Sequence, residues 1–130
     1  MVIDTSALLA ILFREPEEAR LLTAITIAAR SWVCPVNWTE AMIVAEGRKG
    51  EDAANRLLLI IAHLEIGMTA IDTNTAWMAQ DAWRRFGKGR HRAALNMGDC
   101  WAYAAARQRD EPLLFKGQDF TKTDILVAAW

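Results

Sequence analysis

The sequence predicts an α/β fold: three layers, α/β/α, with a central parallel sheet of four to five short strands. Short apolar segments typical of buried strands alternate with helical segments of about 10 to 20 residues. Such alternation requires right-handed crossovers, which leave helices on both faces of a sheet. Hydrophobic residues form 53% of the chain and charged residues 24%, which excludes a disordered chain. We expect residues 1–130 to form a single domain with its own core.

The first elements are a strand and a helical hairpin. Residues 1–4 are apolar up to the aspartate and predict a short buried strand. Thr5 or Ser6 can then cap a helix, because their hydroxyls accept hydrogen bonds from free N–H groups. Pro16 precedes two glutamates, and this pattern favours a second helix start. A helical hairpin is therefore expected over residues 6–30.

A strand and two helices follow. Residues 32–35 predict the second strand, which the proline at its end terminates. Asn37 or Thr39 can begin the next helix, and the glutamate at position 40 then falls in its first turn. Gly50 breaks the chain, and apolar residues at helical spacing continue from there until Gly67.

The second half repeats the alternation. Residues 68–71 predict a third strand, and Thr73 or Asn74 can cap a helix that Gly87 ends. The remaining expected elements are a helix over residues 99–109, a fourth strand over residues 112–115 and a short fifth strand over residues 125–128.

Four acidic residues lie where a predicted strand or helix begins or ends. They are Asp4, Glu40, Asp99 and Asp119. Ligands of parallel sheets bind at the carboxyl ends of the strands, so all four are candidates for one edge of the sheet. Carboxylate oxygens suit Mg²⁺ or Mn²⁺, and a cation so held polarises a phosphate and activates a water. Each acid alone could equally cap a helix or close a turn.

The net charge of −1 removes the general basic signature of a nucleic-acid-binding protein. One dense basic segment remains, between residues 84 and 92. Its cations are Arg84, Arg85, Lys88, Arg90 and Arg92. The segment could bind phosphates of a substrate. Alternatively, its first two arginines complement the C-terminal dipole of a helix while the rest is a solvated loop.

Cysteine usage and hydropathy indicate the compartment. Cys34 and Cys100 lack CxxC spacing, so no zinc site is expected and two free thiols fit a reducing environment. The longest apolar run, residues 57–62, is far shorter than the roughly 20 residues that cross a bilayer. The chain leads at once into a predicted strand, so neither a signal peptide nor a membrane span is expected. We predict a cytoplasmic protein without a membrane partner.

Four motifs in order resemble the PIN-domain ribonucleases of the VapC toxin type. They are VIDTSALLA at the start, the Thr-Glu pair at residues 39 and 40, GDCWAYAAA, and LLFKGQDFTKTDI near the end. The resemblance covers the full chain. It implies an endoribonuclease that requires Mg²⁺ or Mn²⁺ and that is the toxin of a type II toxin–antitoxin pair. It also implies an RNA substrate, a homodimer and a VapB-like antitoxin whose C-terminal segment occludes the acidic pocket.

The resemblance assigns roles to individual residues. The four active-site acids would be Asp4, Glu40, Asp99 and Asp119. Three of them, Asp4, Asp99 and Asp119, would hold the metal directly or through water, while Glu40 would orient a water or a second ion. The residues expected to support these ligands are Thr5, Ser6, Thr121 and Asp124.

Three other functions fit part of the pattern. Asp4 could be the nucleophile of a phosphatase or phosphotransferase of similar fold, although haloacid-dehalogenase-like enzymes have a second acid where this chain has Ser6. A receiver-type signalling module uses a late lysine, for which Lys116 qualifies, but also an acidic pair that is missing here. A non-catalytic domain could bind a metal only for stability. A nuclease assay with Mn²⁺ distinguishes the last alternative from an enzyme.

Overall fold

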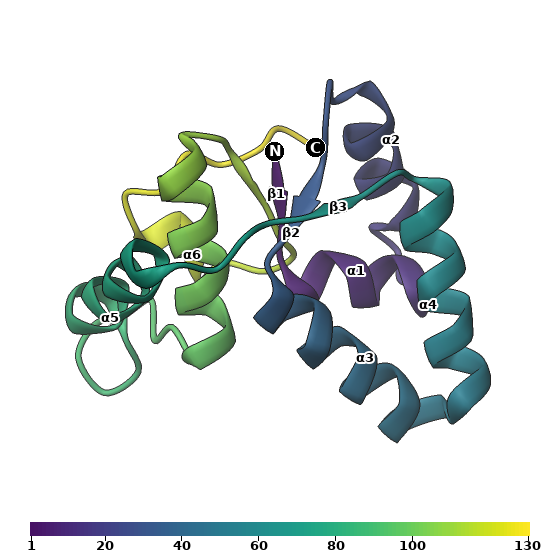
Figure 1. Cartoon of the computed structure of the whole chain (residues 1–130), viewed down its shortest axis with the longest axis horizontal. Coiled ribbons are helices and arrows are strands. Elements are labelled where there is room, and N and C mark those ends of the chain that lie inside the picture. Colours follow the sequence, from purple (N-terminus) through teal and green to yellow (C-terminus); the bar gives the residue numbers. More distant parts are fainter.

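A four-stranded parallel sheet runs through the centre of the computed structural model, which describes residues 1–130 (Figure 1). Its strands are β1 (Val2–Ile3), β2 (Trp32–Val33), β3 (Gly67–Met68) and β4 (Leu113–Leu114). The strand order is β3-β2-β1-β4, and every neighbouring pair is parallel. The chain therefore winds to one side of β1 and then returns to its other side. This reversal places the switch point of the sheet between β1 and β4.

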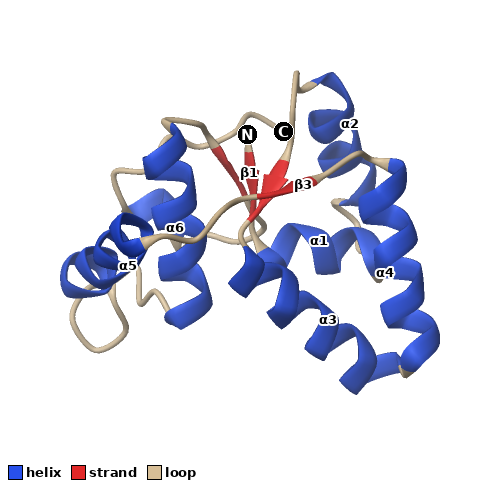
Figure 2. Cartoon of the chain, in the orientation of Figure 1, coloured by secondary structure: helices blue, strands red, loops and turns tan.

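Helices cover both faces of this sheet (Figure 2). They are α1 (Thr5–Leu12), α2 (Glu18–Ile27), α3 (Pro35–Lys49), α4 (Glu51–His63), α5 (Thr73–Phe86) and α6 (Met97–Arg109). The first four pack on one face, while α5 and α6 pack on the other. The predicted three-layer α/β class is thereby confirmed. No helix combines the length and the apolar character that crossing a bilayer requires.

The strands are apolar on both sides because both faces of the sheet are buried. Successive strand residues point in opposite directions. Val2 and Leu113 accordingly join the core under α5 and α6, whereas Ile3 and Leu114 join the core under α1 to α4. All four side chains are fully buried. A strand buried on both faces reads as a continuous apolar run, which is why the sequence revealed it.

Several predicted boundaries shift. Pro35 does not end a strand but begins α3, since proline fits the first helical position, where no N–H bond is needed. Glu40 consequently lies in the second turn of α3, not the first. Asp72 caps α5 in place of the predicted Thr73 or Asn74, and its carboxylate accepts a bond from Thr75 N at 2.8 Å.

The predicted fifth strand is reduced to one bridge. Residues 125–128 form no strand, and only Leu113 and Val127 pair, in parallel. Two backbone bonds hold the segment, from Leu113 N to Leu126 O at 2.8 Å and from Ala128 N to Leu113 O at 3.0 Å. The segment therefore covers the outer edge of β4 without extending the sheet.

Gly67 and Gly47 make a matched pair for testing the packing of the sheet. A Cβ on Gly67 would lie 2.7 Å from two ring carbons of Trp32. The Arg109 guanidinium stacks on this ring, with its Cζ 4.0 Å from the ring centre. We expect Gly67→Ala to lower the free energy of unfolding by about 1–3 kcal/mol. Nothing lies near a Cβ on Gly47, so Gly47→Ala should raise stability by about 0.5–1 kcal/mol. Urea unfolding measures the free energy of unfolding of both variants. A Gly67→Ala variant as stable as the wild type would contradict the packing of Trp32 against Gly67.

Candidate functional site

Asp4 lies at the switch point, directly after β1. Its backbone N–H donates to Leu114 O at 2.9 Å, which joins β1 to β4. Its carboxylate caps α1, because Oδ2 accepts bonds from Ser6 N at 2.9 Å and Ser6 Oγ at 2.5 Å. Only 3% of Asp4 is exposed. Burial raises the pKa of this carboxyl, the bonds from Ser6 lower it, and the Glu40 charge raises it further.

Asn37, in the first turn of α3, links three elements at this point. Its buried amide nitrogen lies 3.2 Å from Asp4 Oδ1, 3.2 Å from Thr5 Oγ1 and 3.1 Å from Gly98 O. An amide has two hydrogens, so it serves two of these acceptors at a time. From the sequence, Asn37 is expected only as a possible helix cap. Its position three residues before Glu40 puts both on one face of α3, which is the signal that could have identified it.

Glu40 reaches from α3 to the start of α6. Thr5 Oγ1 donates to Glu40 Oε2 at 2.6 Å. The carboxylate lies against Gly98, where an added Cβ would come within 2.5 Å of Oε2. An anion is favoured there because the N-terminus of α6 carries a partial positive charge. Only a glycine leaves room for the carboxylate in this position.

Asp99 both caps α6 and belongs to the acidic group. Its Oδ2 accepts a bond from Asn96 N at 2.8 Å, and Asn96 Oδ1 accepts one from Asp99 N at 2.9 Å. Burial raises the pKa of Asp99 to about 6, opposed by the Asn96 bond and reinforced by the charges of Asp4, Glu40 and Asp119. Since all three acids act electrostatically on Asp99, the four carboxylates lie in one region of the molecule.

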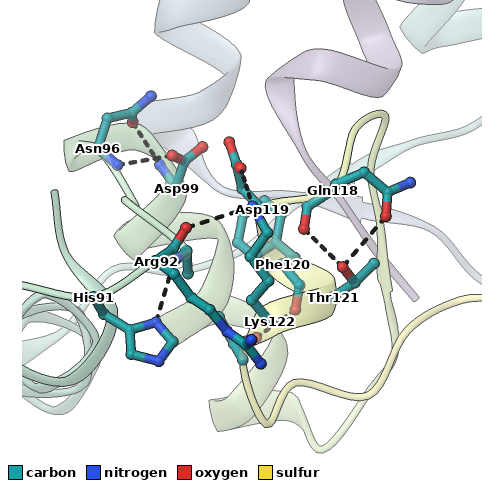
Figure 3. A network of polar contacts seen from close by, with 11 residues as sticks. His91, Arg92, Asn96, Asp99, Gln118, Asp119, Phe120, Thr121 and Lys122 are labelled. Atoms are coloured by element: carbon teal, nitrogen blue, oxygen red, sulfur yellow. Dashed lines mark hydrogen bonds and ion pairs between the residues drawn. The ribbon is translucent and has the colours of Figure 1, made fainter.

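Asp119 approaches from the segment after β4 and precedes the short 3-10 turn Phe120–Lys122. Its side chain is 60% exposed. Lys122 Nζ lies 3.4 Å from Asp119 Oδ1 and 3.4 Å from the backbone oxygen of Arg92 (Figure 3). Lys122 thus connects the acidic group to the basic segment. Lys122 is not among the candidate residues that the sequence predicts.

The predicted supporting residues divide into two pairs. Thr5 and Ser6 do bond to the acids, and Ser6 Oγ also accepts a bond from Lys116 N at 3.0 Å. Thr121 and Asp124 do not bond to any of the four acids. The Thr121 hydroxyl donates to Gln118 O at 2.7 Å. Asp124 instead accepts bonds from Arg85 and from the Tyr103 hydroxyl, both at 2.6 Å, because its segment turns toward α5 and α6.

Arg84 and Arg85 lie in the last turn of α5, as the helix-dipole alternative expects, and the other cations of the basic segment are exposed in the loop that follows. Arg85 forms ion pairs with Asp124 at 2.6 Å and Asp81 at 3.6 Å, so its charge is balanced within the chain. These ion pairs argue against the predicted role of Arg85 in substrate binding, which stays a prediction. The other predicted cations, Arg84, Lys88, Arg90 and Arg92, form no ion pair with an acid. Arg90 stacks its guanidinium 4.0 Å from the ring centre of Trp83.

The chemistry of the acidic group fits a divalent cation, although its side chains are directed elsewhere. No three His, Cys, Asp or Glu side chains are arranged to hold one metal ion. Glu40 is turned to Thr5, Asp99 to Asn96 and Asp119 to Lys122. Yet a hard cation prefers carboxylate oxygens. Its charge would offset the repulsion between the acids, which adds to burial in raising the pKa of Asp99.

Comparison with known proteins identifies the family. The PIN domain family model matches residues 1–126. The protein of Mycolicibacterium smegmatis named Ribonuclease VapC is 44% identical over 125 residues, which cover 96% of this chain and 97% of that protein. Ribonuclease VapC30 of Mycobacterium tuberculosis is 41% identical over 129 residues, which cover 99% of this chain and 98% of that protein.

Solved structures share the fold. Mycobacterium tuberculosis VapC20, described as a Sarcin-Ricin loop cleaving toxin, superposes with a TM-score of 0.78 at 12% identity, covering 96% of this chain and 95% of that one. A toxin–antitoxin complex from Klebsiella pneumoniae superposes with a TM-score of 0.75 at 16% identity, covering 97% of this chain and 94% of that one. The chain therefore belongs to the PIN domain family, within the VapC group that its sequence relatives define. The resemblance seen in the motifs is confirmed.

The raised pKa of Asp99 makes stability depend on pH in a defined direction. A folded-state pKa of about 6 lies above the ordinary value of 3.8, so the folded state binds the proton more tightly than the unfolded chain. The resulting stability is fully present below about pH 4 and is lost as the pH rises to about 6. Asp99→Asn keeps an acceptor for Asn96 N and removes the charge.

We therefore expect metal-free Asp99→Asn to gain stability relative to the wild type as the pH rises from about 4 to about 7. Urea unfolding of both proteins in EDTA at the two pH values measures the gain. A stability difference that is the same at both values would contradict the burial and repulsion assigned to Asp99.

Proposed function

We propose that this chain is an endoribonuclease that depends on Mg²⁺ or Mn²⁺ and hydrolyses RNA phosphodiesters at the four-acid group. One observation carries the proposal: Asp4 after β1, Glu40 on α3, Asp99 on α6 and Asp119 after β4 lie in one region at the carboxyl edge of the sheet, where burial and the neighbouring acids raise the pKa of Asp99 to about 6. Strongly perturbed carboxylates at the switch point of a parallel sheet mark a functional site. The names of the two sequence relatives support RNA as the substrate.

Each residue of the group has a role in this proposal. Asp4, Asp99 and Asp119 would hold the cation. Such a cation stabilises charge on a phosphate oxygen and lowers the pKa of a bound water. Ser6 and Asn37 keep the Asp4 carboxylate in place. Glu40 is fixed by Thr5 through Oε2, so Oε1 is free to accept a hydrogen bond from the attacking water.

The basic residues around the acids would hold the phosphates of the strand. Arg84, Lys88 and Arg92 have no acidic partner, and Lys122 lies beside Asp119. Cations that release counterions give affinity that does not depend on sequence. A local cluster of this kind suits a chain whose net charge is only −1. Arg85 is left out of this set because Asp81 and Asp124 balance it.

We further propose a cytoplasmic toxin that forms a homodimer and is inhibited by a VapB-like antitoxin. Large apolar side chains remain exposed on several elements, among them Ile27, Ile43, Leu59, Trp77 and Met97. Exposed apolar surface of this kind favours protein contacts. The structural neighbour from Klebsiella pneumoniae is a toxin–antitoxin complex, in line with such a partner. Light scattering of the chain alone and with a coexpressed antitoxin tests both associations.

The purified protein should cleave single-stranded RNA with Mg²⁺ or Mn²⁺ and stop in EDTA. Asp119→Asn is the most informative variant, because this exposed side chain makes no buried contact and its replacement should leave the fold intact. We expect it to lower the rate by about 100-fold or more, since even residues that support a metal ligand contribute about 10- to 100-fold. Asp124→Asn, in the same segment, is the matched control and should cleave normally. Cleavage that persists in EDTA, or equal rates for the two variants, would rule out the proposed site.

Gly98→Ala should separate activity from stability. The new Cβ would lie 2.5 Å from Glu40 Oε2, and the flexible glutamate can move aside. Because alanine is also a good helix residue, we expect the melting temperature to stay close to that of the wild type. The cleavage rate should nevertheless fall about 10-fold or more, since Glu40 loses its place. Wild-type activity in a folded Gly98→Ala would show that the position of Glu40 is unimportant.

A further inference from the structure

A largely apolar groove of about 450 Å³ lies between α5 and the start of α6. Two indole rings, Trp83 and Trp101, form part of its wall, together with Met97. Three polar side chains also line it, Gln80, Lys88 and Asn96. None of these six residues is one of the four acids, and apart from Lys88 the proposed function gives them no role.

The groove adjoins the acidic site through one residue. Asn96 lines the groove and also bonds to Asp99, with Asn96 Oδ1 accepting from Asp99 N at 2.9 Å. Cys100 lines it too, and the pKa of this thiol is raised to about 11, first by burial and then by the charge of Asp99. A molecule held at the acids would therefore have its neighbouring portion beside the groove.

The charges along this route are positive. Lys88 lies on the groove, and the Arg90 guanidinium is stacked on Trp83, which lines it. Neither cation has an acidic partner. Closer to the acids, Lys122 Nζ lies 3.4 Å from Asp119 Oδ1 and 3.4 Å from the backbone oxygen of Arg92 (Figure 3). Cations beside aromatic surface complement an anionic strand with flat bases.

We propose that this groove binds one unpaired base of the RNA strand, beside the phosphate held at the acidic group. The inference rests on the proposed ribonuclease function and deepens it by naming a subsite for one base of the substrate strand. The rings of Trp83 and Trp101 supply stacking surface, and the Gln80 amide offers a donor and an acceptor to the edge of a base. A base paired within a helix cannot enter such a groove, because its faces and edges are already engaged.

A binding cycle tests the proposal. The Asp119→Asn background with Mg²⁺ prevents cleavage, and fluorescence anisotropy measures Kd for end-labelled single-stranded RNA. The series includes oligonucleotides with one abasic nucleotide at each position. Stacking of a base is worth about 1–3 kcal/mol, so Trp101→Leu should weaken binding about 5- to 150-fold. Trp83→Leu is the second variant and, being more exposed, tests the groove if Trp101→Leu is unfolded.

Removing the base at one position of the RNA should weaken binding as much as Trp101→Leu does. With that abasic oligonucleotide, the Asp119→Asn protein with and without Trp101→Leu should have the same Kd, because the lost base and the lost ring belong to one contact. Trp77→Leu is the matched control: this tryptophan is 64% exposed on α5 but does not line the groove, so Kd should not change. Duplex RNA of the same sequence should bind more weakly than the single strand.

Several results would overturn the proposal. A base in the groove would be excluded if both groove variants bound RNA as tightly as their parent, or if duplex RNA bound as tightly as the single strand. It would also be excluded if the loss from Trp101→Leu simply added to the loss from every abasic position. If Trp101→Leu alters the mass in light scattering and leaves RNA affinity intact, the groove is a protein contact. Cleavage of RNA by the wild type is measured separately. If the wild type cleaves RNA but the groove variants keep their affinity, only the base subsite is wrong; if the wild type does not cleave RNA, the ribonuclease function itself is wrong.

Discussion

Negative charge gathered at the carboxyl edge of the sheet is the constraint on which the rest of the site depends. Burial and like-charge repulsion disfavour the ionised forms of Asp4 and Asp99. Hydrogen bonds to the carboxylates hold them in place against this repulsion. Ser6 donates to Asp4, Thr5 donates to Glu40, and the backbone N–H of Asn96 donates to Asp99. A fold that retains such a conflict loses stability, and conflicts of this kind are expected where function requires them.

Capping and chemistry are combined in the same side chains. Asp4 is the N-cap of α1, and Asp99 completes the capping box of α6. Each carboxylate gives one oxygen, Oδ2, to these helix bonds. The Oδ1 of Asp99 is left without a hydrogen bond, while that of Asp4 faces the amide of Asn37. The structural and functional interpretations of these acids, which the sequence presented as alternatives, are therefore compatible.

The two faces of the sheet have different parts in the site. Helices α1 and α3, on one face, bring Thr5, Ser6, Asn37 and Glu40. Helix α6, on the other, brings Asp99, and the segment after β4 brings Asp119 and Lys122. Asn37 joins the two faces across the edge, from α3 to Gly98 O on α6. The basic segment and the groove lie on the α5–α6 side alone, so a substrate strand would approach the acids from there.

The sequence by itself determined what depends on neighbouring residues. Apolar runs bounded by Asp4 and by the glycines at positions 50 and 87 predicted the layers and most helix limits, because helix capping and strand burial act over a few residues. The helix expected to continue to Gly67 ends at His63 instead, and Gly67 begins β3. The order of the four acids along the chain predicted the acidic group. Tertiary structure alone decided which distant groups meet. Arg85 and Asp124 pair across 39 positions, Asn37 bonds to Gly98 across 61, and Lys122 reaches the Arg92 backbone across 30. Residue type and spacing do not encode such contacts, since they form only when the packed sheet and helices bring the segments together.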